Sequence, residues 1–138
     1  MFKKANMQYR KLGNTGLIVS ALSYGNFNSN KVIPLEEQVK ILKLLFENGV
    51  NHIDTAEIYT EGKDEEDLGK VLKEINEPRE NYVISTKVWM QPDPSLNSKA
   101  STNRKHVKES LHGSLKRLQL EYVDIIYAHS YDYDTPIE

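Results

Sequence analysis

Short apolar runs alternate with longer amphipathic segments along this chain, and the alternation predicts the fold class. The apolar runs lie at 21–25, 50–53, 82–86 and 122–128. Between them, apolar residues recur at three- and four-residue spacing, which is typical of a helix with one buried face. Strands joined by helical crossovers pair in parallel, because such crossovers are right-handed and return the chain in the same direction. The pattern therefore predicts an α/β fold of four parallel strands alternating with helices.

The predicted helices have apolar stripes and recognisable ends. The stripes are Val39, Leu42, Leu45 and Phe46; Leu68, Val71, Leu72 and Ile75; and Val107, Leu111, Leu115 and Leu118. Pro34 precedes the first stripe in the position that a first-turn proline favours, and Gly49 follows it where a glycine commonly ends a helix. A β-hairpin is predicted over 8–20, with its turn at 14–16. A long polar loop is predicted over 89–103.

Composition narrows the function classes. The chain has 138 residues, of which 28% are charged, and a formal net charge of −2. We expect one domain over 1–138, with neither a nucleic acid partner nor insertion into a membrane, because the charge is balanced and no long apolar segment occurs. The chain has no cysteine, which excludes disulfides and a thiol nucleophile. No histidine spacing predicts a metal site, and the expected location is cytoplasmic.

Polar residues with chemical potential follow three of the predicted strands. Asp54 ends the second strand, Lys87 ends the third and His129 ends the fourth, while Tyr59 lies in the loop after the second. In parallel α/β sheets the carboxyl ends of the strands meet at one edge, where ligands bind. We therefore predict that a carboxylate, an ammonium, an imidazole and a phenol gather at one rim as a proton-transfer site.

Each of these residues also has a purely structural interpretation. Asp54 and Glu57 have the spacing of a helix-capping pair. Lys87 could extend its ammonium into water, Tyr59 could be a half-buried loop aromatic, and His129 could be a histidine satisfied at a strand end. Their corresponding positions in successive βα units favour the shared site.

The chain resembles the aldo-keto reductases, and within them the β-subunits of voltage-gated potassium channels. The resemblance is carried by MQYRKLGNTGLIVSALSYGNF at 7–27, NGVNHIDTAEIYTEGKDEEDLGKVLK at 48–73, YVISTKVW at 82–89 and RKHVKESLHGSLKRLQLEYVDIIYAHSYDYDTPIE at 104–138. It implies a (β/α)₈ TIM barrel that binds NADPH along its carboxyl rim. The G-x-G-x-x-G fingerprint of a Rossmann domain is absent from the sequence, in agreement with this.

The resemblance implies a role for each candidate residue. Tyr59 would protonate a carbonyl oxygen as hydride arrives, Lys87 would make the phenol a better acid, Asp54 would hold Lys87, and His129 would hydrogen-bond the substrate oxygen. Channel β-subunits carry asparagine at the position of His129, whereas reductases generally carry histidine, so this residue favours carbonyl reduction. Cofactor contacts are expected from Gly25, Asn26, Phe27 and Asp54.

Length separates this sequence from the family pattern. A (β/α)₈ barrel takes about 250 residues, so the resemblance implies the N-terminal half only, about four of eight βα units and incomplete at the C-terminal side. The residues that grip most of the NADP(H) would lie in the other half, and we do not count on cofactor binding by this half alone. An open half-barrel would also leave sheet edges and an apolar face uncovered.

Three functions are consistent with these features. The first is NADPH-dependent reduction of a small carbonyl substrate, with the second half of the barrel on another chain. The second is a non-catalytic structural or regulatory subunit of a larger assembly, including regulation like that of a channel β-subunit, in which a protein partner covers the open edge. The third is a dimer of half-barrels, which would not recreate the second-half cofactor residues.

Overall fold

The computed structural model describes residues 6–89, 95–99 and 101–136, so the predicted loop 89–103 lies partly outside the described residues. The strands are β1 (Tyr9–Lys11), β2 (Ile18–Ser20), β3 (Ser23–Gly25), β4 (His52–Asp54), β5 (Val83–Val88) and β6 (Ile125–Ala128). The α-helices are α1 (Ser29–Val32), α2 (Leu35–Glu47), α3 (Lys63–Ile75) and α4 (Arg104–Leu118). Two short 3₁₀ turns, η1 (Tyr59–Gly62) and η2 (Arg79–Asn81), complete the described secondary structure.

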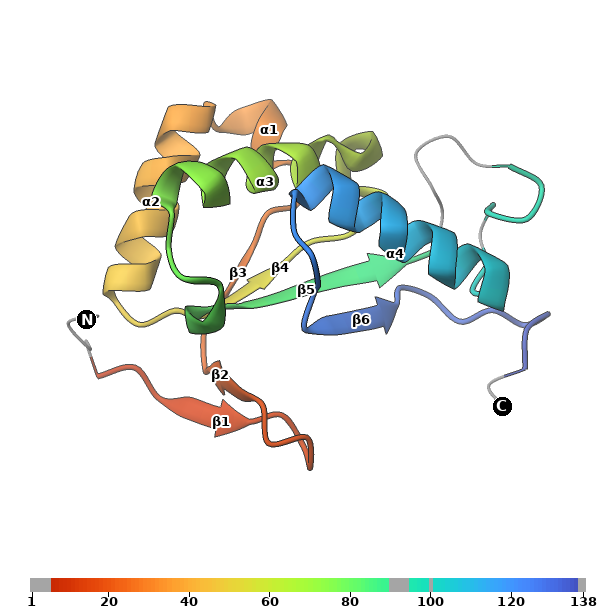
Figure 1. The fold of residues 1–138 in the computed structure, drawn as a ribbon, viewed down its shortest axis with the longest axis horizontal. Coiled ribbons are helices and arrows are strands. Elements are labelled where there is room, and N and C mark those ends of the chain that lie inside the picture. Colours follow the sequence, from red (N-terminus) through yellow and green to blue (C-terminus); the bar gives the residue numbers. More distant parts are fainter. Residues whose placement is uncertain (1–5, 90–94, 100, 137–138) are drawn as a thin grey trace.

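A four-stranded parallel sheet is the central element of the fold. Its strand order is β3-β4-β5-β6, and each strand pairs with the next one along the chain. Sequential order with helical crossovers is the arrangement of consecutive units in a (β/α)₈ barrel. All four helices lie on the same side of the sheet, and the arrowheads of β4, β5 and β6 point the same way (Figure 1). The predicted α/β class, with the architecture of half a TIM barrel, is confirmed.

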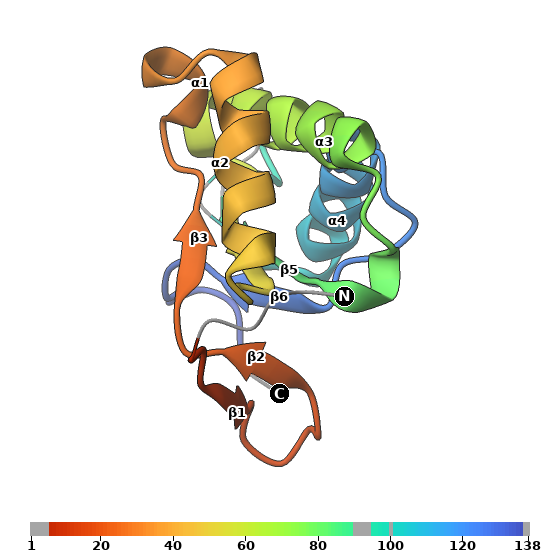
Figure 2. The same ribbon diagram turned by 90° about the vertical axis from the view of Figure 1, so that its left-hand side faces the viewer.

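The N-terminal hairpin lies at the amino end of the sheet. β1 and β2 pair antiparallel, and they stand apart from the helical layer (Figures 1 and 2). The Tyr9 hydroxyl donates to the carbonyl of Gly49 (2.9 Å), and the Asn51 side chain accepts from the Ser20 amide (2.7 Å). These bonds attach the hairpin to the end opposite the carboxyl rim.

The helix ends follow from local chemistry. Gly49 has a φ of 86°, a left-handed conformation that glycine adopts without strain, and it lets the chain turn from α2 into β4. The side chain of Asn103 caps α4 by accepting from the His106 amide (3.0 Å). Three acidic residues, at 64–66, occupy the first turn of α3, where the helix dipole favours negative charge. The three predicted apolar stripes lie within α2, α3 and α4, whereas the one-turn α1 was not predicted.

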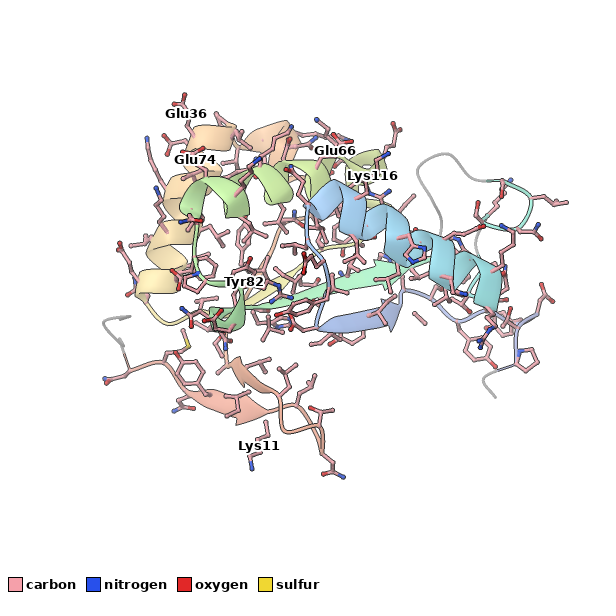
Figure 3. The ribbon with its side chains drawn as sticks, viewed as in Figure 1. Lys11, Glu36, Glu66, Glu74, Tyr82 and Lys116 are labelled. Atoms are coloured by element: carbon pink, nitrogen blue, oxygen red, sulfur yellow. The ribbon has the colours of Figure 1, made fainter. Side chains whose placement is uncertain are left out.

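The core lies between the sheet and the helices. It consists of Val39, Leu42, Phe46, Ile53, Leu68, Val71, Leu72, Tyr82, Ile84 and Leu118. Figure 3 shows Tyr82 among these elements, whereas Glu36 and Glu74 extend from the outer side of the helices. Side chains alternate along a strand, so the residues beside Ile53 and Ile84 in sequence face the other side of the sheet. That other face corresponds to the barrel interior, and it carries Asp54, Ser85 and Lys87.

Candidate functional site

The Lys87 ammonium is the centre of the candidate site. It donates to Asp54 Oδ2 (2.6 Å), to the carbonyl of Thr55 (2.7 Å) and to Tyr59 Oη (2.9 Å). An ammonium has three protons, so all of its donors are used. The Lys87 side chain is only 14% exposed. The ammonium therefore does not extend into water; it joins the end of β4, the following loop and β5 at one point.

Tyr59 contacts two other aromatic rings. The Phe27 ring meets it edge to face with centroids 4.9 Å apart, and the His129 ring does so at 5.7 Å. The Lys87 ammonium also lies 4.6 Å from the centre of the Tyr59 ring. Tyr59 is half-buried, whereas Phe27 and His129 are exposed. The structure thus brings all four residues of the predicted proton-transfer site to one rim.

The turn that carries Tyr59 is held in an unusual conformation. Thr60 and Glu61 both have a positive φ, of 46° and 57°, and glycine follows at position 62. Side chains with a Cβ rarely adopt this conformation, and each such residue costs on the order of 1 kcal/mol. The Asp64 carboxylate offsets this cost, because it accepts from the Thr60 hydroxyl (2.9 Å) and from the Asn28 amide (2.8 Å). One buried carboxylate therefore ties the Tyr59 turn to the loop after β3.

Glu57 is a buried residue near the candidate site. From the sequence it could be interpreted only as the partner of Asp54 in a helix-capping pair. Its two carboxylate oxygens accept from the Trp89 amide (2.7 Å) and the Ser110 hydroxyl (2.6 Å), and the His106 ring lies 3.2 Å away. Asp54 and Glu57 thus have separate partners and form no capping pair. Glu57 and His106 are both fully buried. The helical spacing of Ser110 and His106 on α4 was the available signal, since it places both on one face.

The imidazole of His129 stands at the end of β6. Its backbone amide donates to the Val88 carbonyl (2.9 Å), which extends the β5–β6 pairing past the last residue of the strand. Partial desolvation of the ring, and then the positive charge of Lys87, lower the pKa of His129 below its usual value. The ring is therefore neutral at neutral pH and can donate or accept a hydrogen bond.

The residues predicted to contact a cofactor divide into two environments. Gly25 and Phe27 are exposed at the rim, and the space where a Cβ of residue 25 would stand is open. Asn26 is buried, and its amide donates to the Asp64 carbonyl (2.9 Å), although its side-chain oxygen has no hydrogen-bond partner. The exposed ring of Phe27 beside Tyr59 fits a planar group at this rim. The contacts themselves stay predictions.

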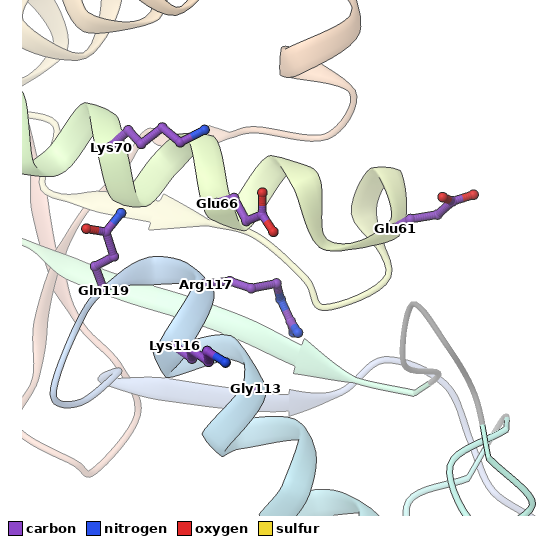
Figure 4. Close-up of a pocket in the computed structure, with 7 residues that line it drawn as sticks. All are labelled: Glu61, Glu66, Lys70, Gly113, Lys116, Arg117 and Gln119. Atoms are coloured by element: carbon purple, nitrogen blue, oxygen red, sulfur yellow. The ribbon is translucent and has the colours of Figure 1, made fainter.

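A separate groove of about 580 Å³ lies on the outer side of the helices. It runs between α3 and α4, and its lining includes Glu66, Lys70 and Lys116 (Figure 4). Its lining includes none of the four candidate residues, Asp54, Tyr59, Lys87 and His129, so it is distinct from the candidate site. Among the described residues, no cluster of acidic or histidine side chains could hold a metal ion. Nor does any described helix have the length and apolarity to cross a bilayer.

Sequence comparison identifies relatives of the same family. A family model described as "Aldo/keto reductase family" matches residues 21–138. The "Putative voltage-gated potassium channel subunit beta" of Schizosaccharomyces pombe is 42% identical over 139 residues, which is 99% of this chain and 40% of that protein. A protein of Arabidopsis thaliana, "Probable voltage-gated potassium channel subunit beta", is 42% identical over 96% of this chain and 40% of its own length.

Solved structures agree with the sequence comparison. A crystal structure titled as the "putative aldo-keto reductase" of Pseudomonas aeruginosa superposes with a TM-score of 0.75 and 34% identity, covering 91% of this chain and 48% of that one. The chain belongs to the aldo/keto reductase family. It spans less than half the length of these relatives.

Proposed function

We propose that this chain carries the proton-transfer site of an NADPH-dependent reductase that converts a small aldehyde or ketone into an alcohol. The observation that supports the proposal most directly is the Lys87 ammonium, which is bonded at once to the Tyr59 phenol and the Asp54 carboxylate. Membership of the aldo/keto reductase family supports it as well. The family generally uses NADP(H).

Tyr59 is the proton donor in this proposal. Its hydroxyl faces a rim with exposed neighbours, so a carbonyl oxygen can approach it. When the phenol gives up its proton, the Lys87 ammonium at 2.9 Å stabilises the phenolate. The Asp54 carboxylate holds the ammonium in place, and the neutral His129 ring donates a hydrogen bond to the same substrate oxygen. NADP(H), when bound, supplies the hydride to the carbonyl carbon.

The residues that would hold NADP(H) in this half are those that leave room for a planar ring beside Tyr59. Phe27 presents its exposed ring at the rim, and the space around Gly25 is open. Asp54 is 28% exposed, so it keeps a surface toward the rim while it binds Lys87.

The experiment is a fluorescence titration of NADPH with the purified chain, followed by a carbonyl-reduction assay on binding variants. Saturable binding with one site per chain would mean that this half has its own cofactor site, whereas no binding would mean that the reductase needs the second half of the barrel. Tyr59→Phe should bind NADPH as the wild type does. Reduction by Tyr59→Phe should fall about 10²- to 10⁴-fold, the usual contribution of a positioned acid. Tyr122→Phe is the matched control, because its ring lies against the Arg79 guanidinium (3.9 Å) in the segment before β6, away from the carboxyl ends of the strands. Unchanged turnover in Tyr59→Phe would remove it from the acid role.

A second candidate function is a non-catalytic subunit of a larger assembly. Two relatives carry the name of a channel β-subunit, and the barrel-interior face of the sheet lacks a covering layer among the described residues. Under this function a protein partner covers that face and the β6 edge, where Ile126 and Tyr127 are each 40% exposed. The cytoplasmic location stays a prediction under both functions.

Two measurements together distinguish the two functions: the NADPH titration, and light scattering after size-exclusion chromatography, which gives the oligomeric state. A partner-dependent subunit should self-associate when purified alone, because it exposes an apolar face and an unpaired strand edge. A stable monomer of 15.9 kDa that binds NADPH would contradict it. Association without NADPH binding would support the non-catalytic subunit.

A further inference from the structure

A hydrogen-bonded chain continues from the candidate site into the barrel-interior face of the sheet. Asp54 uses one carboxylate oxygen, Oδ2, for Lys87, and its other oxygen, Oδ1, accepts from the Ser85 hydroxyl (2.6 Å). The Ser85 oxygen in turn lies 3.0 Å from Nε2 of His52. Neither Ser85 nor His52 was a candidate functional residue on sequence grounds. Together with Asp54 they connect His52, at the amino end of β4, to the Lys87 ammonium.

The direction of each bond in this chain follows from the donors available. An ionised carboxylate can only accept, so the single hydroxyl proton of Ser85 points to Asp54. The O···O distance of 2.6 Å is typical of a hydroxyl bound to a charged oxygen. Since Ser85 has no second proton, Nε2 of His52 must carry the proton that it shares with the Ser85 oxygen. The neutral ring of His52 is therefore the Nε2–H tautomer.

The electrostatic surroundings keep the His52 ring neutral. Burial lowers the pKa of His52 below its usual value, and the Lys87 charge adds to this, while Asp54 and Asp124 act in the opposite direction. These are the charged groups that face the ring from β4, β5 and the segment before β6. A neutral ring adds no positive charge that would compete with Lys87 for the Asp54 carboxylate.

We propose that His52 and Ser85 are positioning residues: they occupy Asp54 Oδ1 and so orient Oδ2 toward the Lys87 ammonium. The inference rests on the proposed reductase function only for its effect on turnover. Without the Ser85 hydroxyl, the Asp54 carboxylate can rotate about its Cβ–Cγ bond. Lys87 then no longer has an acceptor in a fixed position. The ammonium then no longer stays 2.9 Å from Tyr59 Oη, and stabilisation of the phenolate declines.

The first test uses nuclear magnetic resonance on the purified chain and needs no activity. Ring ¹⁵N shifts at pH 7.5 should show His52 with its proton on Nε2; a proton on Nδ1 would overturn the inference. The Lys87 ammonium protons should exchange slowly with water in the wild type, because all three are bonded. In Ser85→Ala, exchange should become about five- to tenfold faster, as expected for the loss of one hydrogen bond in the chain.

Two further variants separate positioning from a general loss of structure. Ser85→Thr keeps a hydroxyl and should restore slow exchange of the Lys87 ammonium. Ser23→Ala is the matched control, because Ser23 pairs with His52 in the neighbouring strand and lies outside the chain of bonds. It should exchange like the wild type. Equal exchange rates in Ser85→Ala, Ser85→Thr and the wild type would overturn the inference.

A turnover assay keeps the inference and the proposed function apart. If the wild type reduces carbonyls, Ser85→Ala should lower kcat about tenfold or more with little change in KM, because misplacement of a reacting group affects the chemical step. An unchanged kcat would overturn the inference and leave the function standing. If the wild type shows no reduction, the proposed function fails, and the ammonium exchange rates still decide whether His52 and Ser85 position Lys87.

Discussion

Asp54 and Glu57 lie three residues apart in one motif, DTAE, yet they serve opposite faces of the molecule. The Asp54 carboxylate stands on the barrel-interior face at 28% exposure and binds an ammonium beside a phenol. The Glu57 carboxylate is fully buried on the helical side, where it binds a backbone amide and a serine hydroxyl. The difference shows that two carboxylates of one motif can have separate surroundings: Asp54 lies at the candidate site, and Glu57 lies in the core on the other side of the sheet.

The largest effect is expected on the open face. Lys87→Met removes the charge that stabilises the Tyr59 phenolate, so carbonyl reduction should fall about 10²- to 10⁴-fold. Binding of NADPH should change less, because the proposed contacts of Phe27 and Gly25 stay in place. The control is Lys70→Met on the outer surface of α3, where the lysine pairs with Asp67. An equal loss in both variants would contradict a role for Lys87 at the site.

The next effect concerns stability and belongs to the helical side. Glu57→Leu leaves the Trp89 amide and the Ser110 hydroxyl without their acceptor in a buried place. Each unsatisfied group costs about 1–3 kcal/mol, so the free energy of unfolding in urea should fall by about 3 kcal/mol. Glu66→Leu is the control, since its carboxylate pairs with Lys63 at an exposed site and should matter by less than about 0.5 kcal/mol. Similar urea midpoints for the two variants would contradict the scaffolding role.

A smaller effect probes how closely the helical layer packs. A Cβ added at Gly69 on α3 would lie 2.7 Å from backbone oxygens of Arg117 and Leu118, which cannot move independently of α4. Gly69→Ala should therefore cost about 1–3 kcal/mol, although alanine favours helices. At Gly113 the nearest atom belongs to the flexible end of the Arg117 side chain. Gly113→Ala should be neutral or stabilising, and thermal unfolding of both variants measures the difference.

The smallest effect is the expected loss of stability when the pH is lowered. The pKa of His52 is lowered in the folded chain, so between the folded and unfolded pKa values the unfolded state binds more protons. Stability from this ring is present above about pH 6.5 and is lost as the pH falls through the lowered value. The urea midpoint should drop from pH 7 to pH 5, and His52→Gln should reduce that drop. The same dependence in both proteins would contradict a lowered pKa for His52.

Local pattern was sufficient for much of this molecule. The four strand runs and the three apolar stripes each need only spacing along the chain, and the parallel sheet follows from their alternation. Asp54, Lys87 and His129 could be predicted at one rim because each lies at or beside the carboxyl end of a strand. Gly49 could be predicted as a helix end because a left-handed residue is required there.

Other features depend on neighbours that no local pattern specifies. The one-turn α1 has no apolar stripe, and the Asp64 carboxylate stabilises the loop that contains it through the amides of Asn28 and Asn30. The hydrogen bond between Glu57 and Ser110 joins residues 53 positions apart, and the one between His52 and Ser85 joins residues 33 positions apart. Such bonds form only when the sheet register brings the strands together.

The amino-acid sequence by itself determined the α/β class, the family resemblance and the candidate residues Asp54, Tyr59, Lys87 and His129, because periodicity and strand-end position are properties of the chain. Only the tertiary structure decided which partners those residues have. The pairing of β4 with β5 places Asp54 beside Ser85 in register, and the pleat puts both on one face with Lys87. The strand register therefore places Asp54 at the rim, whereas Glu57, three residues later, lies in the core.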